Sequence, residues 1–172
     1  APTEEPQTVW SSGDVTVSAV RSTHIAGHAS YRVDTPAGSV VVGGDAGNDK
    51  LASPRATSTS DQVERLAKGA TVIVHSTIHP VMGPDRDSGM PPPVFHRQST
   101  ASDLGAMAQR AGARHLVLTH LIPPPGAPVQ GLWKVPGGAL SEASYVQAAA
   151  GGGFKGETLV ARDLLSLRLP AK

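Results

Sequence analysis

The sequence predicts an α/β fold in which helices cover a mixed sheet, and three observations support this. Short apolar runs rich in valine alternate with polar residues at period two, as half-buried strands require. Two segments instead carry apolar residues at helical spacing, and a glycine follows each of them. The predicted elements also alternate between strands and helices, which favours parallel pairing between the strands that helices connect.

The first predicted elements are strands. Residues 15–20 alternate between apolar and polar side chains and lead to His24. A hairpin over residues 31–42, with proline and glycine in its turn, leads to the sequence Gly-Gly-Asp45. Both His24 and Asp45 are therefore expected just beyond the ends of strands.

The rest of the chain alternates helices with strands, and serine, threonine and glycine mark the helix ends. Proline-rich segments separate some of these elements and are expected to form loops. In order, the prediction is a helix from Ser60 to Gly69, a central strand at 72–74, a long loop at 79–98, a helix from Thr100 to Gly112, a buried strand at 115–120, an irregular loop to 138, a helix at 141–150 and a closing strand at 158–169.

The composition limits the classes of function that the chain can have. The chain has 172 residues, 39% hydrophobic and 17% charged, with a formal net charge of +1, so charge gives no reason to expect binding to nucleic acid or a membrane. Cysteine is absent, which leaves histidine and carboxylates as the plausible metal ligands. No apolar run approaches the roughly 18 residues of a membrane span. Residues 1–13 are expected to be a linker and residues 14–172 the folded domain.

Three candidate ligands follow predicted strands. His24, Asp45 and His120 each lie where an apolar run gives way to glycine, proline or small residues. Strand-end loops are where α/β proteins keep their sites, and His and Asp both bind zinc. The alternative is a pair of histidines that cap carbonyl groups and an aspartate in a glycine-rich turn. Spacing alone does not decide between the two.

The order of several motifs resembles a known family. These motifs are Thr-Val-Ser-Ala-Val before His24, Tyr31-Arg32-Val33, Gly43-Gly44-Asp45, Val72-Ile73-Val74-His75, Ser99-Thr100-Ala101, Leu118-Thr119-His120 and the ending at 154–164. Together they resemble the C-terminal half of metallo-β-lactamase-fold hydrolases, in the ribonuclease Z and arylsulfatase-like branch. The resemblance covers roughly residues 14–169, and it implies half of an αββα sandwich.

The resemblance also implies roles for the three candidate ligands. His24 would bind one metal ion, His120 the other, and Asp45 would bridge two zinc ions, or manganese or iron in their place. In the family, a hydroxide between the ions attacks an ester-type centre, such as a sulfate ester, a phosphodiester or a lactone. The alternative is a non-catalytic binding or assembly domain of the same fold.

Two departures from the family pattern bear on catalysis. Gln98 occupies the position of a histidine that often donates a proton; glutamine can only hydrogen-bond a substrate oxygen, so His96 is a possible substitute. Ser76 replaces the glutamate that usually follows His75, and both residues are expected to support a ligand rather than bind metal. His28 and His115 have no predicted role in the site, although His28 could face the pocket.

The family's His-x-His-x-Asp-His motif does not occur in this sequence. We therefore expect the remaining ligands to come from an N-terminal half of the same fold, either cleaved from this chain or separate from it. Half a sandwich would otherwise expose an apolar sheet face. A self-paired homo-oligomer is the less favoured alternative. The expected substrate is a small molecule rather than nucleic acid, and the sequence does not distinguish a periplasmic from a cytoplasmic location.

Overall fold

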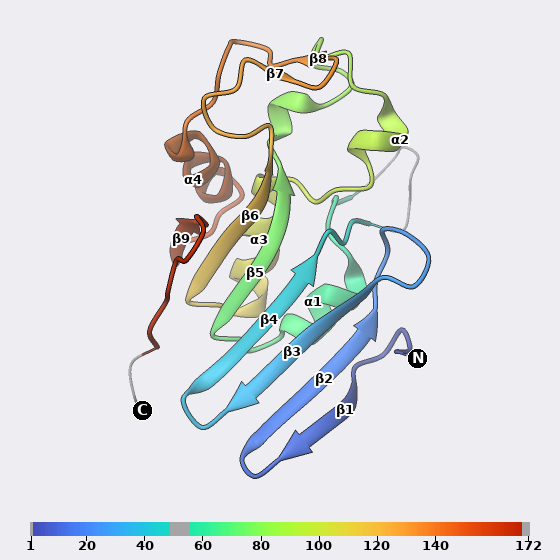
Figure 1. Cartoon of the computed structure of the whole chain (residues 1–172), viewed down its shortest axis with the longest axis vertical. Helices are drawn as coiled ribbons and strands as arrows, with labels where there is room; N and C mark the ends of the chain where they lie inside the picture. The colour runs from blue at the N-terminus through green and yellow to red at the C-terminus, as the bar shows by residue number, and fades with distance from the viewer. Residues whose placement is uncertain (1, 49–55, 170–172) are drawn as a thin grey trace.

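A seven-stranded mixed sheet forms the centre of the computed structural model, which describes residues 2–48 and 56–169 (Figure 1). The strand order in the sheet is β1-β2-β3-β4-β5-β6-β9. The strands are β1 (Gln7–Ser12), β2 (Val15–Arg21), β3 (Ala29–Thr35), β4 (Gly38–Gly44), β5 (Val72–Ile78), β6 (His115–Ile122) and β9 (Glu157–Val160). The predicted α/β class and mixed sheet are confirmed.

The first four strands form an antiparallel meander, and the pairs from β4 to β9 are parallel. The expected linker at residues 1–13 is wrong for residues 7–12, which form the edge strand β1. A two-residue turn at Gly13 and Asp14 joins β1 to β2, and Gly13 has the positive φ that such a turn needs. The prolines and acidic residues before it obscured a strand signal in Val9 and Trp10.

Three helices lie behind the sheet in the view of Figure 1 or beside its β9 edge: α1 (Asp61–Ala67), α3 (Ala101–Ala111) and α4 (Glu142–Gly151). Their predicted ends are confirmed. Ser60 accepts a hydrogen bond from the Val63 amide, Thr100 accepts one from the Asp103 amide, and Gly112 ends α3 in the left-handed conformation. The helices bury their apolar faces against the sheet in one core that includes Val41, Ile73, Leu66, Leu104, Met107, Leu116, Leu118 and Tyr145.

Three loop or strand predictions need correction. The expected loop at 79–98 contains a 3-10 turn, η1 (Pro80–Met82), and the short helix α2 (Pro92–Phe95), which begins with a proline as helices tolerate. The expected loop after β6 contains a small hairpin, β7 (Val129–Gln130) and β8 (Trp133–Lys134). The predicted closing strand at 158–169 pairs only as far as Val160.

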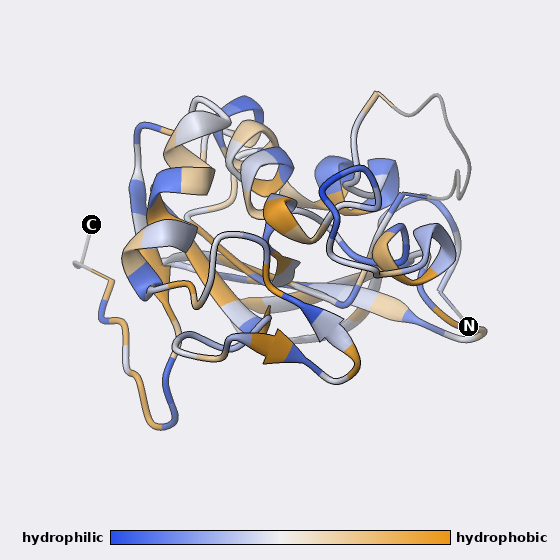
Figure 2. Ribbon diagram, turned by 90° about the horizontal axis from the view of Figure 1, so that it is seen from above, coloured by the Kyte–Doolittle hydropathy of each residue, from blue (hydrophilic) through white to orange (hydrophobic). Residues whose placement is uncertain are grey.

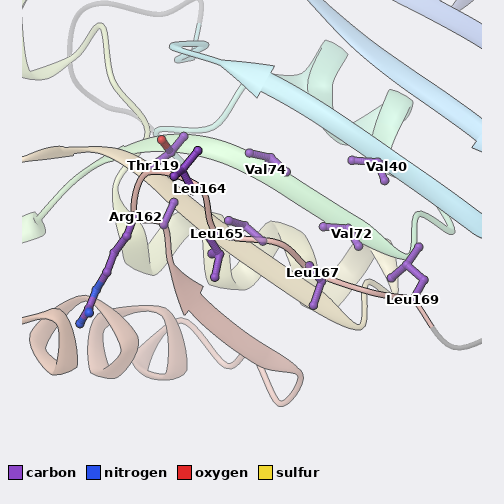
Figure 3. Close-up of a pocket in the computed structure, with 11 residues that line it drawn as sticks. Val40, Val72, Val74, Thr119, Arg162, Leu164, Leu165, Leu167 and Leu169 are labelled. Atoms are coloured by element: carbon purple, nitrogen blue, oxygen red, sulfur yellow. The ribbon is translucent and has the colours of Figure 1, made fainter.

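The chain after β9 instead crosses the sheet face that the helices leave open. Seen from above, the helices lie on one side of the sheet and this tail on the other (Figure 2). Figure 3 shows Leu164, Leu165, Leu167 and Leu169 of the tail over valines of β4 and β5. An apolar groove remains between them, and Leu164 is almost fully exposed. No helix within the described residues is long and apolar enough to cross a membrane.

Candidate metal centre

Two bulges place the candidate ligands at one edge of the sheet. Between β4 and β5 the register skips Gly43, and between β5 and β6 it skips His120. Bulges are frequent beside active sites because they redirect side chains. His120 has φ +44°, a strained conformation for a residue with a Cβ, and such strain accumulates at functional sites. Asp45 therefore follows the end of β4, whereas His120 lies within β6 at a bulge, because pairing resumes at Leu121 and the strand runs two residues beyond its predicted end.

The carboxylate of Asp45 lies between the two predicted histidine ligands. Its Oδ1 is 3.3 Å from Nδ1 of His120, and its Oδ2 is 3.8 Å from Nε2 of His24. Each carboxylate oxygen thus faces a different imidazole. The side chain of His120 is 58% exposed and that of Asp45 is 35% exposed, so solvent reaches this edge. The structure brings together the three residues singled out in the sequence.

The ring of His24 has the orientation that a metal ligand needs. Its Nδ1 lies 3.2 Å from the carbonyl oxygen of Arg97, to which a ring N–H can donate. That bond assigns the proton to Nδ1 and leaves the lone pair on Nε2, which faces Asp45. Histidines that bind metals usually donate their other ring N–H in this way. Imidazole nitrogen and carboxylate oxygen are the donor types that a divalent ion such as zinc takes.

Two further histidines flank the glycines before Asp45. A Cβ on Gly43 would lie 2.1 Å from Cδ2 of His75, and one on Gly44 would lie 2.9 Å from Nε2 of His28. Burial lowers the pKa of His75 to about 4, and burial, helped by nearby His24, lowers the pKa of His28. Both rings are therefore neutral at pH 7 and pack tightly against the loop that carries Asp45.

The two departures from the family pattern contact each other. The hydroxyl of Ser76 donates to Oε1 of Gln98 at 3.4 Å, and both residues are buried. A neutral hydroxyl–amide pair thus occupies the two positions where the family pattern has a glutamate and a histidine. His96 lines a different hollow, with Ser58, Thr100 and Asp103, and the contacts that join His24, Asp45 and His120 do not include it.

The remaining histidines have structural contacts. His79 accepts from the Val81 amide and packs edge-on against Tyr145, and His115 pairs with Glu157. His28, for which the sequence left solvent and the pocket as alternatives, lies beside the site, and its ring packs edge-on against His24. Within residues 2–48 and 56–169, no three His, Asp or Glu side chains form a group that could hold a metal ion by themselves.

The fold and this edge define the class of protein. The chain has the fold of one half of a metallo-β-lactamase domain, as the sequence predicted. YhfI from Bacillus subtilis, a metallo-β-lactamase-fold protein, superposes with a TM-score of 0.59 at 17% identity, over 92% of this chain and 50% of its own. The short form of human tRNase Z superposes with a TM-score of 0.56 at 17% identity, over 97% of this chain and 47% of its own.

Sequence relatives fall in the ribonuclease Z-like branch. The chain is 25% identical over 127 residues to ribonuclease Z of Mycobacterium tuberculosis strain H37Rv, a match that covers 73% of this chain and 42% of that protein. A counterpart in strain CDC 1551 matches equally, over 52% of its length. No family model matches. The chain spans about half the length of the relatives it matches.

Proposed function

We propose that this chain supplies one ligand edge of a binuclear metal site that hydrolyses an ester-type substrate. One observation carries the proposal: the two carboxylate oxygens of Asp45 face His24 and His120 separately. A carboxylate can bridge two ions, whereas an imidazole nitrogen binds only one. His24 would hold one ion, His120 the other, and Asp45 would join them. The similarity to ribonuclease Z supports a metal-dependent hydrolase in general.

Zinc is the ion we propose, with manganese or iron as substitutes, because two imidazoles and a carboxylate suit zinc. A bound pair of such ions makes water a nucleophile at neutral pH and stabilises the charge that develops on the substrate. The protein's own part is to hold the ligands in place. His24 is oriented by the Arg97 carbonyl, and His120 is placed by its bulge.

Gln98 would position the substrate rather than transfer a proton. Its Oε1 accepts from Ser76, so a hydrogen bond to a substrate oxygen would have to come from its amide N–H groups. An amide has no proton to give to a leaving group. Substrates whose leaving oxygen is already a weak base, such as an aryl sulfate or an activated phosphodiester, are therefore the proposed class, whereas a lactone, whose leaving oxygen is an alkoxide, is less favoured. Aryl sulfates remain among the proposed substrates because the sequence resembles the arylsulfatase-like branch.

RNA is a less favoured substrate. The relatives are named ribonuclease Z, but the β3–β4 hairpin turns within residues 35–38, which leaves no inserted segment there that could hold RNA. The formal net charge of +1 also gives no charge-based reason to expect RNA binding. A small-molecule substrate fits these features better.

The remaining ligands would come from a second sheet, the N-terminal half of the same fold. The sheet face opposite the helices carries valines from three adjacent strands, and the tail covers part of it: Val40, Val72 and Val74, which Figure 3 labels, and Val117. Packing of two apolar sheet faces forms the core of sandwich folds. A second sheet on this face would reach the same edge as Asp45, whether it belongs to the same polypeptide or to a separate chain.

The alternative is a non-catalytic binding domain, and the neutral Ser76–Gln98 pair is the observation that favours it. Metal analysis and turnover of the complete protein, with its second half present, distinguish the two. We expect about two zinc equivalents and hydrolysis of p-nitrophenyl sulfate or bis(p-nitrophenyl) phosphate, both lost in His120→Ala. The matched control is His115→Ala. His115 begins β6, at the end of the strand away from His120, and pairs with Glu157. Bound zinc without turnover of any ester would support the binding domain.

A further inference from the structure

A chain of four hydrogen bonds closes around the loop Gly43-Gly44-Asp45. The Asp45 amide donates to Nε2 of His28 at 3.3 Å. Nδ1 of the same ring lies 2.8 Å from the hydroxyl of Ser22. That hydroxyl lies 2.7 Å from the hydroxyl of Ser30, which donates to the carbonyl of Gly43 at 2.8 Å. The chain therefore starts and ends on the backbone of the loop that presents the proposed bridging carboxylate.

The two ends of the chain fix every proton in it. Because a backbone amide can only donate, Nε2 of His28 must be the acceptor, and the ring proton lies on Nδ1. Because the Gly43 carbonyl can only accept, the hydroxyl proton of Ser30 is committed to it. Ser22 then donates to Ser30 and accepts from the ring. All four bonds run in one direction, and in this partly buried network each bond's donor and acceptor are assigned, which holds the parts rigidly.

The packing around His28 agrees with this assignment. Ser30 is fully buried, Ser22 is 4% exposed, and the backbone of Ser22 donates to the carbonyl of His28. Gly44 has φ +62°, and a Cβ there would lie 2.9 Å from Nε2 of His28. The imidazole thus occupies the space directly beside the loop, which only a glycine at position 44 permits.

We propose that His28 is a positioning residue, which with Ser22 and Ser30 locks the Gly43-Gly44-Asp45 loop so that the carboxylate of Asp45 stays between His24 and His120. His28 binds no metal itself in this account. We call the four hydrogen bonds through His28, Ser22 and Ser30 the lock. Its effect on metal binding rests on the proposed function, whereas its existence does not. The experiments below therefore measure the two separately.

The first experiment tests the lock without metal. Amide hydrogen exchange and nitrogen NMR of the metal-free protein should show a protected Asp45 amide and a ring proton on Nδ1 of His28. His28→Ala should remove the protection. His28→Gln, whose side-chain oxygen can reach the position of Nε2, should retain it, and His28→Asn, which can reach Ser22 but not Asp45, should not. An Asp45 amide that exchanges equally in all four proteins overturns the proposal.

The second experiment measures zinc affinity by competition with a chromophoric chelator, and the absorption spectrum of the cobalt-substituted site. Residues that orient ligands typically change metal affinity by about 10- to 100-fold. We expect a loss in that range for His28→Ala, a smaller loss for Ser30→Ala, an altered cobalt spectrum in both, and near-normal behaviour of His28→Gln. His115→Ala is the matched control.

The outcomes separate the two proposals. If the normal protein binds zinc and His28→Ala binds it equally well with an unchanged cobalt spectrum, the positioning role is wrong and the metal site stands. If the normal protein binds no metal but its Asp45 amide is protected through His28, the lock stands and the proposed function is wrong. Loss of affinity in His28→Ala with rescue in His28→Gln supports both.

Discussion

Gly43 is the position where the loop that carries Asp45 is most sensitive to an added atom. In Gly43→Ala the new Cβ would lie 2.1 Å from Cδ2 and 2.6 Å from Nε2 of His75. The ring cannot easily move, because it is buried and its Nδ1–H donates to the Ser76 carbonyl at 2.7 Å. The clash must therefore be relieved by the backbone of β4 or by displacement of His75.

The expected cost lies at the upper end of the range for overpacking. Extra carbon atoms in a packed core typically lower the free energy of unfolding by about 1–3 kcal/mol. Because the ring of His75 cannot easily move, we expect a loss of about 3 kcal/mol. For a domain of this size, that corresponds to a fall in Tm of roughly 6–12 °C. Urea unfolding followed by tryptophan fluorescence and circular dichroism measures it directly.

Two variants sharpen the test. Gly151→Ala, on α4, places its Cβ where no heavy atom lies within 4 Å, so it should raise stability by up to about 1 kcal/mol through helix propensity. In a His75→Ala background the clash disappears, and Gly43→Ala should then cost less than about 1 kcal/mol. A Gly43→Ala protein as stable as the parent, or costs that simply add in the double variant, would refute the contact between Gly43 and His75.

Three further predictions concern stability. His75 has its ordinary pKa of 6.5 in the unfolded chain but a pKa of about 4 in the folded protein, so the unfolded chain binds this proton more readily. The free energy of unfolding should therefore fall by roughly 3 kcal/mol as the pH drops from above 6.5 towards 4. Urea titrations across this range should show a weaker dependence of that free energy on pH in His75→Leu. Arg32→Ala should cost about 2 kcal/mol because Nη1 donates to the carbonyls of Leu66 and Lys68 at the end of α1, whereas Arg162→Ala, which breaks an exposed pair, should leave the denaturation midpoint unchanged. Gly105→Ala should cost about 2–3 kcal/mol and lower Tm in a thermal melt, because its Cβ would lie 2.1 Å from the Ala149 carbonyl where α3 meets α4; a melt that matches the parent would contradict that packing.

Much of the fold could be predicted from local pattern. Period-two alternation located β2, a proline- and glycine-containing turn located the β3–β4 hairpin, and short apolar runs located β5 and β6. The caps at Ser60 and Thr100 located two helices. All of these signals depend on residues close in sequence. The edge strand β1 was missed because its surroundings are polar. The tail after β9 was assigned to a strand because its leucines are apolar, but apolar residues can equally cover a sheet face without pairing in it.

Only part of the candidate site could be predicted from the sequence. Strand ends indicated His24, Asp45 and His120, because the carboxyl ends of neighbouring strands meet at one edge of a sheet. The bulges at Gly43 and His120 could not be predicted, since they depend on the register between strands far apart in the sequence. The role of His28 depends on Ser22, Ser30 and Asp45 converging in space, which no local pattern encodes.

Asp45 is the proposed bridge between the two ions, so the metal site should depend on its carboxylate. The test is the zinc content of the complete protein after dialysis, measured by mass spectrometry of the metal. Asp45→Asn is compared with the parent protein and with the control Asp34→Asn, because the carboxylate of Asp34 pairs with Arg32. A bridge serves both ions, so we predict about two equivalents in the parent and the control and fewer than one in Asp45→Asn. Equal zinc in all three proteins, or none in the parent, would contradict the account.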